Sequence, residues 1–118
     1  MKRYIGSMTL KDYPRCSQDA IRLIADYWVL RIVEELSIAE DGLRFSALQR
    51  LLGGASPATL SNRLRRLEES SLVTREGARG KLSVVYALSE RGQRILPVLN
   101  AIDDFALGKP HSETVPST

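Results

Sequence analysis

The sequence has little of what catalytic and metal sites are built from. It holds one cysteine, Cys16, and one histidine, His111, so it has neither a Cys-x-x-Cys pair nor a spaced set of histidine and carboxylate ligands. It also has no glycine-rich phosphate-binding loop. A lone cysteine cannot close a disulfide within the chain, which agrees with a reducing compartment. We therefore expect no enzymatic activity, no metal and no cofactor.

Long apolar runs are also missing. No stretch approaches the roughly 20 apolar residues that a membrane-spanning helix needs, and the N-terminal residues lack the apolar core of a signal peptide. Aromatic residues make up only 6% of the chain, whereas 43% of its 118 residues are hydrophobic and 26% are charged. This composition is typical of one soluble domain. We expect a cytoplasmic protein with no membrane partner.

Positive charge is concentrated in one part of the chain. The formal net charge is only +3, but residues 44–94 hold ten basic and four acidic side chains, a local net charge of +6. Such a concentration indicates a polyanionic partner if the charges gather on one face of the fold. The alternative is an arginine-rich surface that only keeps the protein solvated.

Periodicity predicts an α+β fold that is mainly helical. Residues 1–15 are expected to form an N-terminal arm, 16–108 the folded domain, and 109–118 a disordered tail. Pro14 disfavours helix at the residue before it. Within the domain, the pattern predicts helices over 17–26, 27–37, 47–52, 57–70 and 89–107, and strands over 43–45, 72–76 and 82–89.

Capping residues mark several of these boundaries. Ser46 and Ser56 each precede a helical pattern and are expected N-caps, and Pro57 suits the first position of the helix that it opens. Gly108 is expected to end the last helix. Pro97 lies inside that helix and is expected to kink it or to loosen one turn.

The helix expected over 57–69 has two different faces. Leu60, Leu64 and Leu67 fall within one narrow stripe at 100° per residue, which predicts a core-facing edge. The opposite side carries small polar residues near the N-terminus and arginines further along. That arrangement suits a recognition helix that enters the DNA major groove. The alternative is an amphipathic surface helix without a ligand.

The neighbours of this helix favour DNA binding. A linker with two glycines joins it to the preceding helix, and a hairpin with a basic turn at 77–81 follows it. The order is typical of a helix-turn-helix with a wing, whose tip can reach the DNA backbone or the minor groove. The candidate DNA-binding residues are Arg44, Ser46, Ser56, Ala58, Thr59, Asn62, Arg63, Arg65, Arg66, Arg79 and Lys81.

Taken in order, these motifs resemble those of the HxlR-type transcriptional regulators, winged helix-turn-helix proteins of bacteria and archaea in the MarR-like superfamily. The resemblance covers about residues 16–107, and its leucine-rich central motif coincides with the candidate recognition helix. The matching pieces are Cys16 before the first expected helix, Trp28, "LRFSAL" (43–48), "SPATLSNRLRRLEESSLVTRE" (56–76) and "YALSERGQRILPVL" (86–99).

The resemblance implies a homodimer, paired through flanking N- and C-terminal dimerisation helices. Two recognition helices would then bind an inverted repeat in double-stranded DNA, in the nucleoid of a bacterial or archaeal cell. The alternative is that the apolar residues of the last helix pack only within their own chain. The sequence departs from the family at "ADYW" (25–28), where Gly-Gly-Lys-Trp is usual, and at Ser70-Ser71, where glycine is common.

Cys16 is a candidate redox sensor by the same resemblance, because parts of the family sense oxidants or electrophiles at this position. Lys11, Arg15 and the start of the first helix are expected to favour the thiolate. With one cysteine per chain, a response would use a bridge across the dimer, a mixed disulfide or direct modification. The alternative is a packing residue at the dimer interface.

Two functions from different classes follow. The first is a dimeric, sequence-specific DNA-binding transcriptional regulator, with a small-molecule effector whose identity the sequence does not determine. The second is a winged-helix protein-interaction module without sequence-specific DNA binding. Affinity for duplex DNA that falls steeply with salt would favour the first.

Overall fold

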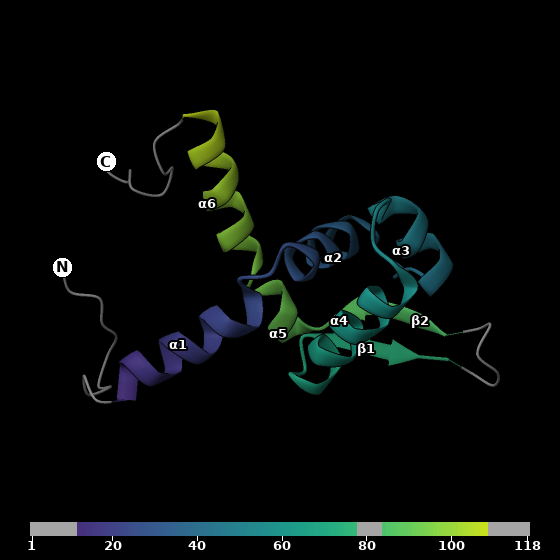
Figure 1. Ribbon diagram of the computed structural model, residues 1–118, viewed down its shortest axis with the longest axis horizontal. Helices are drawn as coiled ribbons and strands as arrows, with labels where there is room; N and C mark the ends of the chain where they lie inside the picture. The colour runs from purple at the N-terminus through teal and green to yellow at the C-terminus, as the bar shows by residue number, and fades with distance from the viewer. Residues whose placement is uncertain (1–11, 78–83, 109–118) are drawn as a thin grey trace.

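The fold is mainly helical, with one short two-stranded sheet. A computed structural model describes residues 12–77 and 84–108, with side chains from Gln18 onward in the first range (Figure 1). None of the described helices has the length and apolar character that a membrane crossing requires. In chain order the described elements are α1 (Asp12–Ile24), α2 (Tyr27–Ile38), α3 (Phe45–Leu52), α4 (Pro57–Glu69), β1 (Val73–Glu76), β2 (Val85–Leu88), α5 (Glu90–Gln93) and α6 (Leu96–Leu107).

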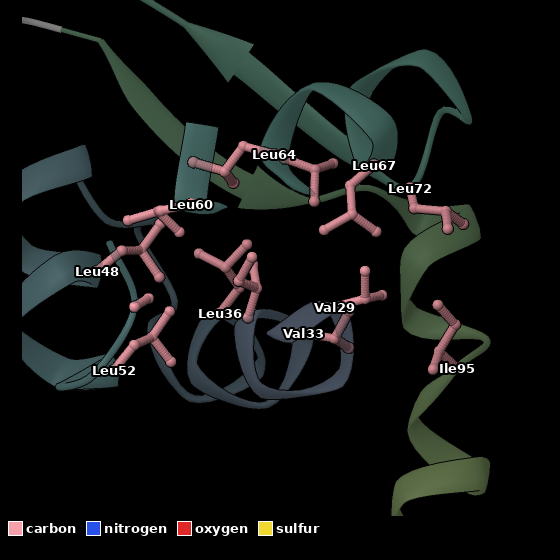
Figure 2. Close-up of a cluster of buried hydrophobic side chains, with 13 residues drawn as sticks. Val29, Val33, Leu36, Leu48, Leu52, Leu60, Leu64, Leu67, Leu72 and Ile95 are labelled. Carbon is pink, nitrogen blue, oxygen red and sulfur yellow. The ribbon is translucent and has the colours of Figure 1, made fainter. Parts of the chain in front are cut away.

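The hydrophobic core lies where α2 meets α3 and α4. α3 buries Leu48 and Leu52 there. Leu60, Leu64 and Leu67 of α4 close the core from the other side, with exposed fractions of 0%, 2% and 0% (Figure 2). The core-facing stripe predicted for this helix is therefore confirmed. The buried residues that α2 contributes are Val29, Ile32, Val33 and Leu36.

β1 and β2 form the wing hairpin. They pair antiparallel, in a register that runs from the Val73–Leu88 pair to the Glu76–Val85 pair. The inner end of the hairpin is anchored, because Val73 is buried in the core. Of the basic turn predicted over 77–81, residues 78–81 lie outside the described residues. A hairpin after α4 is confirmed as the sequence predicted it.

A single residue pair ties the segment before α3 to the wing. Leu43 and Tyr86 exchange two backbone hydrogen bonds, both of 2.8 Å. The predicted strand over 43–45 is therefore reduced to one bridge, because Phe45 already begins α3. Gly42 has φ +84°, and a Cβ on it would lie 2.6 Å from the Tyr86 carbonyl oxygen, so only glycine permits this approach.

The first helix begins earlier than predicted. α1 starts at Asp12 and not at 17. Pro14 falls in its first turn, where an N–H group has no intrahelical acceptor, so the proline removes no hydrogen bond. The expectation that Pro14 disfavours helix at the residue before it is therefore wrong. α1 extends away from the core formed by α2, α3 and α4 (Figure 1).

The last helix predicted, over 89–107, is instead two helices. Ser89 caps α5, because its Oγ accepts a hydrogen bond from the Gly92 N–H at 2.9 Å. Pro97 lies in the first turn of α6, where its fixed φ and missing N–H are tolerated. The structure therefore has two helices where one helix with a kink or a loosened turn was predicted. α6 ends as predicted at Gly108, in the left-handed conformation with φ +74°.

Candidate nucleic-acid interface

The N-terminus of α4 is held by Ser56. Its Oγ accepts a hydrogen bond from the Thr59 N–H at 3.1 Å and donates one to the Thr59 Oγ1 at 3.0 Å. Pro57 occupies the first helical position. The cap and the proline were both predicted, and both are confirmed. The end of the helix that would enter a DNA groove is thus ordered by contacts within the chain itself.

The outer face of α4 is open to solvent. Ala58, Asn62 and Arg65 are exposed and lie on the side opposite the buried leucines. Thr59 is half-buried beside them. The face therefore presents a methyl group, an amide and a guanidinium along successive turns, which together can contact bases and phosphates.

Arg63 and Arg66 leave this face and turn toward the start of α2. The Arg63 Nε donates to both carboxylate oxygens of Asp26, at 3.2 and 3.1 Å. The Arg66 Nη1 lies 3.7 Å from the Asp26 Oδ2, and its Nη2 donates to the Arg22 carbonyl oxygen at 3.4 Å. Two of the candidate DNA-binding arginines therefore contact the junction between α1 and α2.

Asp26 also caps a helix at this junction. Its Oδ1 accepts the Val29 N–H at 3.1 Å and so caps the N-terminus of α2. Partial burial raises the pKa of this carboxyl, but the hydrogen bonds from Arg63 and Val29 and the charges of Arg63 and Arg66 lower it more. The net result is an Asp26 pKa below its usual value, so the group is ionised at neutral pH.

Asp26 was not among the candidate residues. An aspartate just before an apolar helical pattern is a recognisable N-cap, so its capping role was within reach of the sequence. Its pairing with Arg63 was not, because the two residues are 37 positions apart and only the packing of α4 on α2 brings them together.

The candidates before α4 lie at the start of α3. Arg44 takes the N-cap position, with no side-chain cap hydrogen bond, and Ser46 lies within the first turn. The prediction that Ser46 caps this helix is therefore wrong, because α3 already begins at Phe45. Both Arg44 and Ser46 are exposed, which leaves their side chains available to a ligand.

The remaining candidates are on the wing and in α1. Arg79 and Lys81 lie outside the described residues. Arg75, the third residue of β1, is exposed as well. Among the described side chains, no group of three His, Cys, Asp or Glu residues could hold a metal ion.

Comparison with known proteins agrees with this geometry. Residues 23–113 match the family described as HxlR-like helix-turn-helix. YdzF of Bacillus subtilis, an uncharacterized HTH-type transcriptional regulator, is 31% identical over 94 residues, which cover 77% of this chain and 85% of YdzF. The chain belongs to the HxlR family. It is accordingly a transcriptional regulator with a DNA-binding helix-turn-helix, as the sequence motifs predicted.

Solved structures support the HxlR assignment at the level of the fold. The reduced form of the transcriptional regulator YodB from Bacillus subtilis is 26% identical, and the match covers 84% of this chain and 91% of that chain with a TM-score of 0.67. Quinone-bound YodB is also 26% identical, with 79% and 96% covered and a TM-score of 0.65. The mainly helical, winged helix-turn-helix fold predicted from the sequence is confirmed.

Cys16 has a different position from the one expected for this HxlR-family chain. It is the fifth residue of α1 and does not precede the helix. Its side chain and that of Arg15 lie outside the described part, as does Lys11 entirely. The family match begins at residue 23, after Cys16.

Proposed function

We propose that this regulator works as a homodimer that binds a specific DNA sequence through α4. The observation that carries the proposal is the division of α4 into two faces. Its leucine face is buried in the core, and its outer face is exposed to solvent, beginning at the N-terminus that Ser56 caps. A helix held in this way can insert its first turns into the major groove without losing its packing.

Asn62 is the proposed base-reading residue. An asparagine amide can bind adenine with two hydrogen bonds, accepting one and donating one. In the free protein the Asn62 Oδ1 accepts a hydrogen bond from the Arg63 Nη1 at 3.0 Å, which orients the amide. The oxygen keeps a second lone pair for a base, because a carbonyl oxygen has two.

The other proposed contacts surround Asn62. Side chains at the start of α3 and α4 would reach phosphates or base edges, and the wing would reach the backbone or the minor groove. These contacts are Arg44, Ser46, Ser56, Ala58, Thr59 and Arg65, together with Arg79 and Lys81 of the wing.

The dimer is supported by the exposed apolar side of α6. Val98, Ile102 and Phe105 follow one another at intervals of four and three residues, and are 38%, 45% and 86% exposed. Ile21 of α1 is 56% exposed as well. An apolar stripe of this length is characteristic of an association surface. A second copy seated on it would place two α4 helices on successive major grooves, and an inverted-repeat operator would match that symmetry.

We extend the proposal to a signal received at Cys16. YodB, which shares the fold, has been solved with a quinone bound, and Cys16 lies in α1, the helix that also carries the exposed Ile21. A modification there would change the angle between the two α4 helices. Diamide or quinone should then alter operator affinity in the wild type but not in Cys16→Ser. If the two proteins respond alike, Cys16 is a packing residue.

Salt dependence tests the central proposal. Affinity for duplex DNA should fall steeply with salt, by about 0.9 in log K per log unit of salt for each neutralised phosphate. The measurement is fluorescence anisotropy with a duplex that the protein selects from a random pool. A flat response, or no binding to duplex DNA at low salt, would identify a protein-interaction module instead.

Asn62→Ala tests which face of α4 meets the bases. The loss on the selected duplex should be about 1–3 kcal/mol, with little change on scrambled DNA of the same length. Arg79→Ala is the comparison, because a contact with phosphate or groove shape should weaken both duplexes alike. An unchanged ratio in Asn62→Ala would mean that another side of the helix faces the DNA.

A further inference from the structure

The flank of α4 carries two arginines that share one carboxylate within the protein, that of Asp26. The Arg63 guanidinium contacts both oxygens of the Asp26 carboxylate, and Arg66 approaches one of them. The three side chains are between 19% and 34% exposed, so the cluster is partly shielded from solvent. An ion pair in that setting is screened less by salt than one on the open surface.

A carboxylate between two guanidiniums resembles the contact that a DNA phosphate makes. The N–H groups of a guanidinium donate to the oxygens of a carboxylate and to those of a phosphate alike. Arg63 and Arg66 can therefore satisfy their charge on Asp26 or on a phosphate, and the two anions compete for them. Arg65, one residue away on the exposed side, has no such competitor among the described contacts.

We propose that Asp26 is a specificity-determining residue, whose carboxylate takes the place of a DNA phosphate and withholds Arg63 and Arg66 from the backbone. This inference rests on the proposed function of α4. Phosphate contacts strengthen binding to every sequence equally, whereas base contacts strengthen binding to one. By holding back two charges per protomer, Asp26 lowers affinity for random DNA and leaves discrimination to residues such as Asn62.

Asp26→Asn isolates the charge of this residue. Asparagine accepts the Val29 N–H as aspartate does, so the cap of α2 survives. Its amide has one acceptor oxygen and no charge, so Arg63 and Arg66 lose the ionic contacts that compete with a phosphate. Random duplex should bind on the order of tenfold more tightly at about 50 mM salt. The slope of log K against log salt should steepen by up to about 2 per protomer, and the ratio of selected to random affinity should fall.

Two control variants separate this effect from a general change in charge. Glu68→Gln removes one negative charge from the exposed far end of α4 and should leave the slope and the ratio close to the wild type. Arg63→Ala/Arg66→Ala in the Asp26→Asn background should abolish the gain, because no withheld arginine is left to release. Asp26→Ser, which retains a capping hydroxyl, repeats the test if the asparagine variant folds poorly.

The results distinguish the two proposals. If the wild type shows salt-dependent DNA binding but Asp26→Asn matches it in slope and ratio, Asp26 is only a structural clamp and this inference is overturned. Weaker binding of Asp26→Asn to both duplexes, or an equal gain in Glu68→Gln, overturns it as well. If the wild type does not bind duplex DNA, the proposed function is wrong, and the inference about Asp26, which rests on it, is wrong as well.

Discussion

α4 and α6 are helices of 13 and 12 residues with opposite relations to the rest of the chain. α4 is largely polar, yet it buries three leucines completely or nearly so. α6 is richer in apolar residues, yet none of them is fully buried. Leu96 and Leu99 of α6 pack against the core, while its other side projects from the body of the molecule (Figure 1). The apolar face of α4 is thus buried within one chain, whereas part of the apolar surface of α6 stays exposed in it.

The ends of the two helices differ as well. α4 begins with a serine cap, whereas Ile95 before α6 makes no side-chain cap hydrogen bond. Each helix is followed by a residue with a positive φ. After α6 this residue is Gly108, at φ +74°, whereas after α4 it is Ser71, at φ +64°, where a side chain is disfavoured. The N-terminus of α4 is therefore stabilised by a side-chain cap, whereas a serine with an unfavourable positive φ follows its C-terminus. This difference predicts which substitutions should change stability most.

Leu64→Ala should have the largest effect on stability. Leu64 is 2% exposed in the core, and truncation there should lower the free energy of unfolding by about 2–5 kcal/mol. Chemical denaturation at one fixed protein concentration measures it. Leu51→Ala is the matched control, because Leu51 is 50% exposed and the same truncation should cost much less. Equal losses of stability in both variants would contradict the conclusion that the leucine face of α4 is buried in the core.

Ile102→Glu should affect assembly rather than folding. On the proposed dimer surface, the new charge would be buried without a partner, and the dimer should weaken by at least about a hundredfold, or roughly 2.7 kcal/mol. Sedimentation should then show a folded monomer at micromolar concentration. Asn100→Glu adds the same charge on the opposite, exposed side of α6 and should remain dimeric. A dimeric Ile102→Glu would place the interface elsewhere.

Ser56→Ala should have an intermediate effect. It removes the acceptor of the Thr59 N–H and should cost about 1 kcal/mol of stability in the absence of DNA. Ser61→Ala, at an exposed position inside the same helix, should change stability by less than about 0.5 kcal/mol. The comparison uses thermal unfolding of both variants. If Ser56→Ala is as stable as Ser61→Ala, the cap contributes nothing.

Ser71→Gly should have the smallest effect, and it should be stabilising. Glycine adopts a positive φ without steric cost, so the variant should gain a few tenths to about 1 kcal/mol. The Ser71 carbonyl oxygen, which accepts the Ser89 hydroxyl at 2.7 Å, is unaffected. Ser70→Gly is the control and should destabilise, because φ there is −91° and glycine adds only freedom to the unfolded chain. A loss of stability in Ser71→Gly would contradict the argument.

The sequence predicted the features of α4 that depend on its own residues. The spacing of Leu60, Leu64 and Leu67 defines a buried edge at the helical period, and Ser56 with Pro57 defines where the helix starts. The hairpin after α4 and the glycine at the end of α6 were predictable for the same reason. Each of them is a local pattern of a few neighbouring residues.

The tertiary structure decided what depends on contacts between distant residues. Asp26 meets Arg63 only because α4 packs across α2, so which arginines of α4 remain available for DNA could not be seen in the sequence. Pro97 was equally able to kink one helix or to separate two, and the packing of Leu96 and Leu99 on the core accompanies the second arrangement. Local periodicity predicts which residues share a face. Which face is buried, and against which element, depends on the free energy of packing the whole chain. That free energy adds contacts between distant residues, so a short stretch of sequence does not reveal it.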